Sequence, residues 1–422
     1  MGVRESVFLA AVGCAACLLG ADAAQERQPA AATAPEVRDL TWHACMALAC
    51  EHNPDILAAQ FNLKKSSSSA KAVAGQRYPA VSLESSLARS EDGASDNRVG
   101  GPVSGSSMMQ QDDEASISLA SRYDLYTGGR VTSEIRGANA ARRQADATLD
   151  ATRHETLCDL RRAFASLLYA QDLISLSENI ATQRETNLGL VQLRFEGGIE
   201  HKGSYLLSRA LYEQAVMEIR QARRTRRTAQ LELARLIGRP SETDIRAQGS
   251  LDKAWQVSAT NWEERVRNHP VNKTKEAELD MAVEGVEQAR SKFRPTLALV
   301  GSSSVYSKDV DLDTYRWRVA LVMSLPLFTG WQNENALEAS KEGLRMAGEN
   351  LRSAQDKLRT QMQTAMAQLI DARERVEVLR TLLDAVTIRS EIARQQFNSG
   401  MLRFENWDLI ENDAINRRKE ML

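Results

Sequence analysis

The sequence predicts a mainly α-helical protein that also contains a pair of β-hairpins and is built from two internal repeats. Each repeat has an apolar heptad pattern that continues for most of a long helix, and a strictly alternating segment that ends in a Thr-Gly turn. Two landmarks recur at the same separation of 202 positions: Tyr126-Thr127-Gly128 with Phe328-Thr329-Gly330, and Phe195-Glu196-Gly197-Gly198 with Phe397-Asn398-Ser399-Gly400. The repeat therefore governs the architecture.

The first 39 residues are predicted to form a targeting signal followed by a lead-in segment. Arg4 precedes an apolar run over residues 7–19 and then Ala21-Asp22-Ala23, which predicts a signal peptide over 1–23. A lipoprotein is the alternative, with Cys14 or Cys17 as the lipidated residue, although the sequence before Cys14 is a poor match. Residues 24–39, rich in Ala, Gln and Pro, predict an extended lead-in.

The first repeat is expected over residues 40–240 and the second over 261–422, joined by a linker at 241–260. Asn53-Pro54 and His269-Pro270 lie 216 positions apart and mark helix breaks or first-turn prolines. Cys45 and Cys50 lie five apart on a predicted helix and so point to different faces. We expect small buried cysteines there and no disulfide.

Strand hairpins are predicted over 80–126 and 296–328. Apolar residues alternate along them with polar or small ones, as in strands that meet lipid or a core on one side only. The segments 91–114 and 302–314 are predicted to be exposed loops, and the 14-residue difference between the repeats belongs there. Four strands cannot close a transmembrane barrel, since single chains need about eight. Open edges are not tolerated in lipid, so several chains would have to share one barrel.

A very long helix is predicted after each Thr-Gly turn. The heptad residues are Leu160, Leu167, Ile174, Ala181, Leu188 and Phe195 in the first repeat, and Met362, Leu369, Val376, Leu383, Ser390 and Phe397 in the second. Each helix would be roughly 100 Å long at 1.5 Å per residue, so most of it must lie in water. Glycines then reverse the chain at tips 195–199 and 397–401. The final helix is about 18 residues shorter than its first-repeat counterpart, because Gly400 lies 22 residues before Leu422 whereas Gly198 lies 40 before Gly238.

These residues together resemble the TolC-type outer-membrane efflux proteins from Leu40 onward. The motifs are Glu51-His52-Asn53-Pro54, Asp124-Leu125-Tyr126-Thr127-Gly128-Gly129-Arg130 with Leu325-Pro326-Leu327-Phe328-Thr329-Gly330, and Arg194-Phe195-Glu196-Gly197-Gly198-Ile199 with Phe397-Asn398-Ser399-Gly400-Met401. The resemblance implies a homotrimer with a shared 12-stranded barrel in the outer membrane and a helical coiled-coil tunnel in the periplasm. It also implies two partners, a periplasmic adaptor and an inner-membrane pump of the RND or ABC type. The expected function is a passive exit duct of a tripartite efflux or type I secretion system.

The resemblance also assigns roles to residues. Adaptor docking is expected at the tips, through Phe195, Gly197, Gly198, Ile199, Phe397, Gly400 and Met401. The strand-to-helix turns are Thr127, Gly128, Thr329 and Gly330. The family often has an aspartate lining the periplasmic entrance six residues past the tip glycine, where this chain has Ser204 and Asn406. Asp408 lies two residues on and faces differently, so we expect a polar, weakly charged constriction.

Two other function classes are weighed against the duct. The first is a secreted structural coiled-coil protein whose strands only pack on its own helices. The second is a periplasmic enzyme, which is disfavoured because the sequence has no nucleophile elbow, phosphate loop or metal-like spacing, and no cofactor is expected. A formal net charge of −2 gives no basic footprint for nucleic acid.

Two smaller features leave alternatives open. The basic run is Arg220, Arg223, Arg224, Arg226 and Arg227. It predicts a solvated helix face, with an anion-binding or adaptor-facing patch as the sharper alternative. His201 is expected to be an exposed turn residue and not a ligand or pH sensor.

Overall fold

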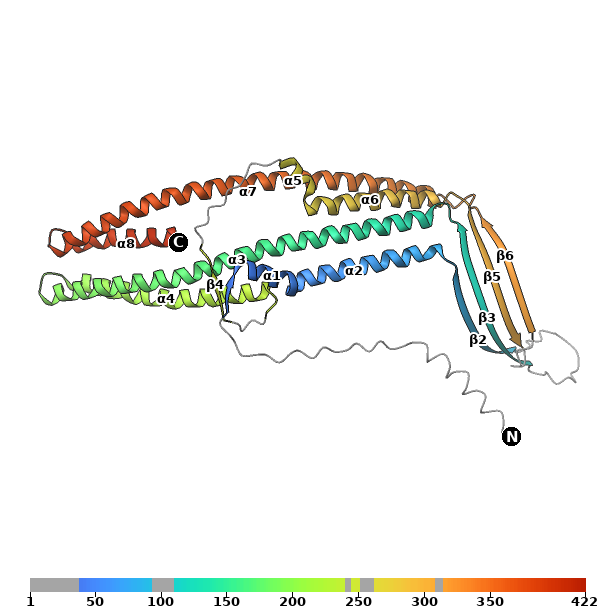
Figure 1. Ribbon diagram of the computed structural model, residues 1–422, viewed down its shortest axis with the longest axis horizontal. Coiled ribbons are helices and arrows are strands. Elements are labelled where there is room, and N and C mark those ends of the chain that lie inside the picture. Colours follow the sequence, from blue (N-terminus) through green and yellow to red (C-terminus); the bar gives the residue numbers. More distant parts are fainter. Residues whose placement is uncertain (1–37, 93–109, 240–243, 251–261, 308–313) are drawn as a thin grey trace, which may run out of the picture.

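The computed structural model describes residues 38–92, 110–239, 244–250, 262–307 and 314–422. The predicted signal peptide, nearly all of the lead-in and parts of the loops and linker lie outside these residues. The molecule is elongated, with a β-sheet at one end and two helical hairpin tips at the other (Figure 1). Within the described residues, no helix combines the length and apolar character needed to cross a membrane.

Two helices of 67 residues each run the length of the helical part: α3 (Arg130–Glu196) and α7 (Gln332–Asn398). The chain returns along α3 as α4 (Lys202–Leu236) and along α7 as α8 (Phe404–Met421). The heptad residues Leu160, Leu167 and Ala181 are buried in the first repeat. This arrangement confirms the predicted pair of long helical hairpins.

The second repeat is less completely packed than the first. Its heptad residues Ser390 and Phe397 are buried near the tip, but Val376 is 41% exposed. The cause is that α8 has 18 residues where α4 has 35, so it covers only the part of α7 near the tip.

Shorter helices cover the half nearest the sheet. They are α1 (Trp42–His52), α2 (Pro54–Ala74), the 3-10 turn η1 (Gly75–Arg77), α5 (Trp262–Asn268) and α6 (Pro270–Ser291). The Asn53 side-chain oxygen accepts from the backbone N–H groups of Asp55 and Ile56 at 2.9 and 3.1 Å, and its amide donates to the Leu236 carbonyl at 2.8 Å. His269 caps α6 in the same position of the second repeat. Both prolines are first-turn residues, as predicted.

The hairpins form one antiparallel sheet of order β2-β3-β5-β6, from β2 (Ala80–Asp92), β3 (Gln110–Tyr126), β5 (Thr296–Ser307) and β6 (Thr314–Ser324). One face is apolar and open: Val81, Leu83, Leu87, Trp317, Val319, Leu321 and Met323 are 63–72% exposed. The alternative in which the hairpins pack on the chain's own helices is therefore wrong. In the part of the chain that the structure describes, strands β2 and β6 have no partner along their outer edges.

The predicted strand ends need correction. Residues 302–306, expected in a loop, belong to β5 because they pair with β3 on one side and β6 on the other, and Ser307 extends the pairing with β3. Residues 91–92 and 110–114, also expected in a loop, extend β2 and β3. In contrast, 325–328 lie outside β6, which ends before Pro326, a residue without an N–H to donate.

A second sheet was not predicted. Strand β1 (Arg38–Thr41) pairs in parallel with β4 (Ile245–Gln248), which lies inside the expected linker. Ile245 and Ala247 of β4 are buried in the largest apolar cluster, together with Leu160 and Leu167 of α3 and Leu233 of α4. The two-stranded sheet thus ties the linker to the middle of the helices.

The cysteine prediction is half correct. Cys45 is buried in the same cluster, and burial raises its pKa to about 11. Cys50, expected to be buried, is exposed, and Cys45, Cys50 and Cys158 are free thiols. The difference follows from the helix period, since a five-residue step turns Cys50 away from α3.

Candidate functional site

The two helical hairpin tips have the same backbone design. At the first tip, Gly198 has φ +74° and the N–H groups of Ile199 and Glu200 donate to the Arg194 carbonyl at 2.9 and 3.2 Å. At the second tip, Gly400 has φ +77°, and Met401 and Leu402 donate to the Gln396 carbonyl at 2.9 and 3.2 Å. The left-handed backbone explains why glycine is needed there.

Each tip presents one apolar side chain to solvent. Ile199 is 73% exposed and Met401 is 77% exposed, at the end of the molecule farthest from the sheet (Figure 1). Exposed apolar residues on a rigid turn can enter a pocket on a partner with little loss of conformational entropy. The geometry therefore suits docking, and the predicted docking role of the tips stays a proposal.

An aromatic cluster holds the second tip together. The rings of Phe397 and Trp407 stack with centroids 4.2 Å apart, and Phe404 lies edge-on to both. The guanidinium of Arg194, from the first tip, lies 4.3 Å from the centre of the Phe397 ring. The first tip is packed more lightly, with Phe195 stacked on Tyr205 at 5.6 Å. One cation–π contact thus joins the two tips of a single chain.

The three constriction candidates lie in different surroundings. Ser204 is 1% exposed, and its hydroxyl donates to Glu200 at 3.1 Å. The Ser204 backbone N–H donates to His201 Nδ1 at 3.2 Å, so exposed His201 serves as the N-cap of α4. Asp408 turns inward to Arg184, with N and O 3.4 Å apart. Of the three, Asn406 is the exposed one in a single chain.

A polar network that the sequence did not reveal joins α3 to α8. The carboxylate of Glu411, a buried residue, accepts from Gln183 of α3 at 2.6 Å and from Arg394 of α7 at 3.0 Å. Arg184 of α3 is 7% exposed and contacts Asp408 and Asn412. These side chains cross-link the two helical hairpins a few turns from the tips. Sequence reasoning missed them because charged residues at this spacing usually form a solvated face.

The pH dependence of Asp408 gives one test of this network. Burial raises the pKa of Asp408, against the opposing effects of Arg184 and Asn412. An aspartate with a higher pKa in the folded state binds its proton more tightly there, so protonation favours folding, and this contribution is lost as the pH rises through the folded pKa. We therefore expect Asp408→Asn to melt at a higher temperature than the wild type at pH 7. The difference should close as the pH falls through the folded pKa of Asp408, and a difference that widens in acid would contradict the assignment.

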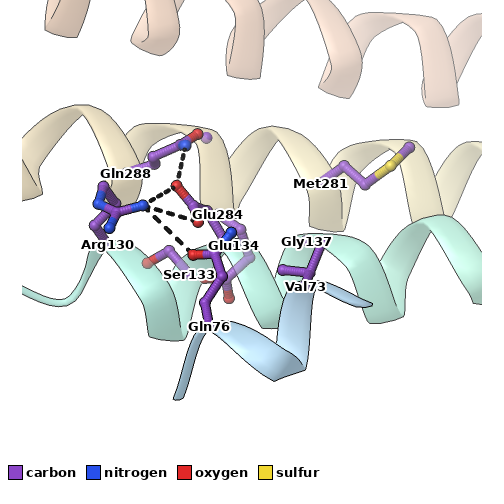
Figure 2. Close-up of a pocket in the computed structure, with 10 residues that line it drawn as sticks. Val73, Gln76, Arg130, Ser133, Glu134, Gly137, Met281, Glu284 and Gln288 are labelled. Carbon is purple, nitrogen blue, oxygen red and sulfur yellow. Dashed lines mark hydrogen bonds and ion pairs between the residues drawn. The ribbon is translucent and has the colours of Figure 1, made fainter. Parts of the chain in front are cut away.

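A cleft of about 400 Å³ lies near the other end of the helices, between α2, α3 and α6 (Figure 2). In it, Arg130 Nη1 donates to both oxygens of Glu134 at 2.9 and 3.1 Å, and Gln288 donates to Glu134 at 3.1 Å. Arg130 also lies 3.7 Å from Asp124, at the end of β3. The described residues contain no group of three or more metal-ligating side chains. The contacts of Arg130 and Glu134 join the end of β3 to α3 and α6, where the strands pass into the helices.

The basic run lies on α4. All five arginines are exposed, and Arg223 pairs with Glu178 of α3 at 3.0 Å. Four of them, at 220, 223, 224 and 227, fall on one face of the helix, opposite the buried Ala215, Ala222 and Ala229. This is the solvated face that the sequence predicts, and an anion-binding role stays an untested alternative.

The chain is similar in sequence to known proteins of one family. A family model described as outer membrane efflux protein matches residues 46–239 and 265–402. The alkaline protease secretion protein AprF of Pseudomonas aeruginosa is 30% identical over 188 residues, which cover 42% of this chain and 38% of AprF. The cobalt-zinc-cadmium resistance protein CzcC of Cupriavidus metallidurans is 25% identical over 285 residues, covering 67% of this chain and 65% of CzcC. The matched regions thus span less than two thirds of either relative.

Solved structures share the fold. The structure of CusC has a TM-score of 0.79 at 16% identity and covers 94% of this chain and 91% of its own. The CmeC outer membrane channel of Campylobacter jejuni also has a TM-score of 0.79, at 15% identity, and covers 90% of this chain and 81% of its own. The likeness extends over the sheet and the helical hairpins together.

Proposed function

The chain belongs to the outer membrane efflux protein family, and we propose that it is the outer-membrane exit duct of a tripartite efflux or type I secretion system. In this proposal the duct is passive, and its partners supply the energy. The observation that carries it is the open sheet, which has an exposed apolar face and, within the described residues, two unpaired edges on a chain with 67-residue helices.

The sheet supports an assembly of several chains in lipid. Its apolar face is the kind of surface that acyl chains cover, and its edges would be unsatisfied there unless other strands pair with them. We propose a homotrimer, because three sets of four strands give a 12-stranded barrel wide enough for a solute path. Two sets would give eight strands, a size whose interior side chains fill.

The helices would form the tunnel wall in the periplasm. Helices of 67 residues are about 100 Å long, far more than a bilayer's ~30 Å apolar core. We propose that a periplasmic adaptor docks on the tips and that an inner-membrane pump of the RND or ABC type completes the path.

The polar network suggests how the entrance could open. Contacts between α3 and α8, such as Arg184 with Asn412 and Gln183 with Glu411, hold the hairpins together through hydrogen bonds that water can replace. Adaptor binding at the tips would favour an arrangement in which the hairpins separate, and so shift the population to a conducting state. Exposed Asn406 would then leave the entrance polar and weakly charged.

Alanine at the left-handed tip positions should weaken adaptor docking. Gly198→Ala with Gly400→Ala forces a side chain into a backbone conformation that costs about 1–2 kcal/mol per residue. We expect the turns to distort and adaptor co-purification to fall about tenfold or more. The matched control is Gly189→Ala with Ser399→Ala, because Gly189 lies within α3 with nothing within 4 Å of an added Cβ, and Ser399 has φ −80°. Equal docking by both pairs would contradict a docking role for the tip geometry.

Export in living cells tests the function. A strain lacking the gene should retain the solutes or proteins that its partner pump exports, and the wild-type gene should restore export. The alternative, a secreted structural coiled-coil protein, predicts release into the soluble periplasmic fraction and unchanged export.

A further inference from the structure

The exposed arginines of α4 differ from the other charged helix faces of this chain. The segment 219–231 contains five arginines and no acidic residue. Along α7, in contrast, acids are interleaved with bases, and Lys341, Arg345 and Arg359 each pair with an acid three residues earlier at 2.6–3.1 Å. On α4 the arginine spacings of three and four residues place like charges side by side, which destabilises a helix. The basic run therefore carries an electrostatic cost that an ordinary solvated face avoids.

Most of these guanidinium groups have no acidic partner. Arg223 pairs with Glu178 of α3 at 3.0 Å. Among the described residues, no acidic group lies within ion-pair distance of the rest of the run or of Arg246 in β4. The members of the run without such a partner are Arg220, Arg224, Arg226 and Arg227. Uncompensated positive charge is therefore concentrated at one place on a chain whose formal net charge is −2.

A cleft adjoins this concentration of charge. It has a volume of about 400 Å³ and lies between α3, α4 and β4, with Arg226 and Arg246 among its lining residues. Asp172 and Asp244 also line it, and the buried Gln230 donates to Asp244 and so holds that carboxylate against β4. The cleft thus presents two guanidinium groups and two carboxylates, a set that can bind a carboxylate and an amine of the same ligand.

The position of this surface along the molecule narrows the choice of partner. Gln171 lines the same cleft and lies 41 residues after Arg130 (171 − 130) and 25 before Glu196 (196 − 171). At 1.5 Å per residue, the surface is roughly 60 Å from the strand end of α3 and roughly 40 Å from the tip. Figure 1 shows β4 near the middle of the helices. A lipid headgroup beside the sheet is too far away to reach it, and so is a contact confined to the tips.

The surface would face outwards in the proposed duct. Strands β1 and β4 form a second layer over α3 and α4, in which Ile245 is buried against Leu167 and Leu233. Inside a tunnel such a layer would block the path, so it must lie on the outer side of the wall. Arg226 and Arg246 line one cleft with that layer and therefore face the periplasm.

We propose that the basic run and the adjoining cleft bind the peptide stems of peptidoglycan, and so anchor the duct where it crosses the cell wall. Peptidoglycan is the extended polymer between the two membranes, and its stems carry free carboxylates and amines at regular intervals. Arginine binds carboxylates through paired N–H donors, and Asp172 can accept from an amine. A repeating polymer engages several arginines at once, which raises the effective affinity. This inference rests on the proposed function, because a duct that spans the periplasm must cross the cell wall.

Sedimentation with insoluble, purified peptidoglycan tests the proposal. The full-length protein is extracted in detergent, mixed with peptidoglycan at low salt, and the bound fraction is measured after pelleting. The helix-face variant combines Arg220→Gln, Arg224→Gln and Arg227→Gln. We expect its apparent affinity to be about tenfold below that of the wild type, whose binding should itself weaken as salt is raised. Peptidoglycan whose carboxylates have been converted to amides should not retain the wild type.

The cleft provides a second variant, Arg226→Gln with Arg246→Gln. We expect a several-fold loss of apparent affinity, since both guanidinium groups line the proposed site for one stem. Neither variant removes an ion pair, so the native mass and the melting temperature should equal those of the wild type.

A matched control removes three arginines that have acidic partners. It combines Arg153→Gln, Arg162→Gln and Arg209→Gln, which are exposed and pair with acids on their own helices at 3.1–3.4 Å. The control loses the same charge as the helix-face variant, and we expect it to bind peptidoglycan like the wild type. An equal loss in the control would mean that total charge, and not this surface, governs binding, and would overturn the proposal.

The other outcomes separate this inference from the function beneath it. Wild-type binding by both the helix-face and the cleft variants overturns the peptidoglycan site and leaves the exit duct standing. If the variants lose adaptor co-purification and still bind peptidoglycan like the wild type, the basic run is an adaptor surface and the proposal is wrong. A failure of the duct itself appears elsewhere, as a native mass of one chain and unchanged export in the strain lacking the gene.

Discussion

Replacing Phe397 with alanine should loosen the second tip more than any other single truncation there. Phe397 is fully buried, stacks on Trp407 at 4.2 Å and carries Arg194 on its other side at 4.3 Å. Deleting a buried aromatic ring costs about 3–5 kcal/mol, because the transfer energy is lost and a cavity remains. Here the same change also removes the contact between the two tips. We expect a lower melting temperature, faster tryptic cleavage at Arg194 and Arg403, and reduced export.

The repeat provides a matched control for this prediction. Phe195→Ala makes the same change at the first tip, where the ring is only partly buried and stacks on Tyr205 at 5.6 Å. We expect less than half the loss of stability seen with Phe397→Ala. Equal losses at the two tips would mean that the aromatic cluster of the second tip contributes nothing beyond an ordinary hairpin turn.

Gly238→Ala should be the most damaging change in the middle of the molecule. Gly238 has φ +69° where α4 ends, and a Cβ there would lie 2.2 Å from the His52 carbonyl oxygen and 2.6 Å from its carbon. Backbone atoms cannot rotate away, so the junction of α1, α2 and α4 must shift. Left-handed strain and the clash together should cost on the order of 3–4 kcal/mol. The measurement is the yield of folded, membrane-extracted protein and its melting temperature.

Gly343→Ala serves as the control for the substitution itself. Gly343 lies within α7, and nothing lies within 4 Å of its added Cβ. Alanine should stabilise that helix by up to about 1 kcal/mol. If Gly238→Ala gave the same folded yield and melting temperature as Gly343→Ala, the end of α4 would not pack closely against the end of α1 as described.

The duplicated motifs explain why so much of the fold could be predicted from the sequence. Glycines at 198 and 400 occupy the same left-handed turns, and alternation along 315–323 produces a sheet face with one character. Both signals are local, since they depend on backbone conformation and side-chain period. They therefore identified the hairpins, the tips and the length of the long helices.

Contacts between residues far apart in the sequence could not be predicted from these local signals. Strands β1 and β4 have four residues each and pair Arg38 with Ile245, so neither has enough length to show a period. Glu411 reads as one more charge on a polar helix, and only packing shows that Gln183 and Arg394 surround it. The serines at 302–304 resemble a loop, but pairing on both sides makes them strand.

The proposed exit duct requires several chains to share one barrel. The most direct measurement is the native mass of the protein extracted by detergent from the outer-membrane fraction. We predict a heat-resistant species whose mass is three times that of the single chain after full denaturation. A monomer or dimer in the soluble fraction would contradict the shared barrel, and with it the proposed exit duct.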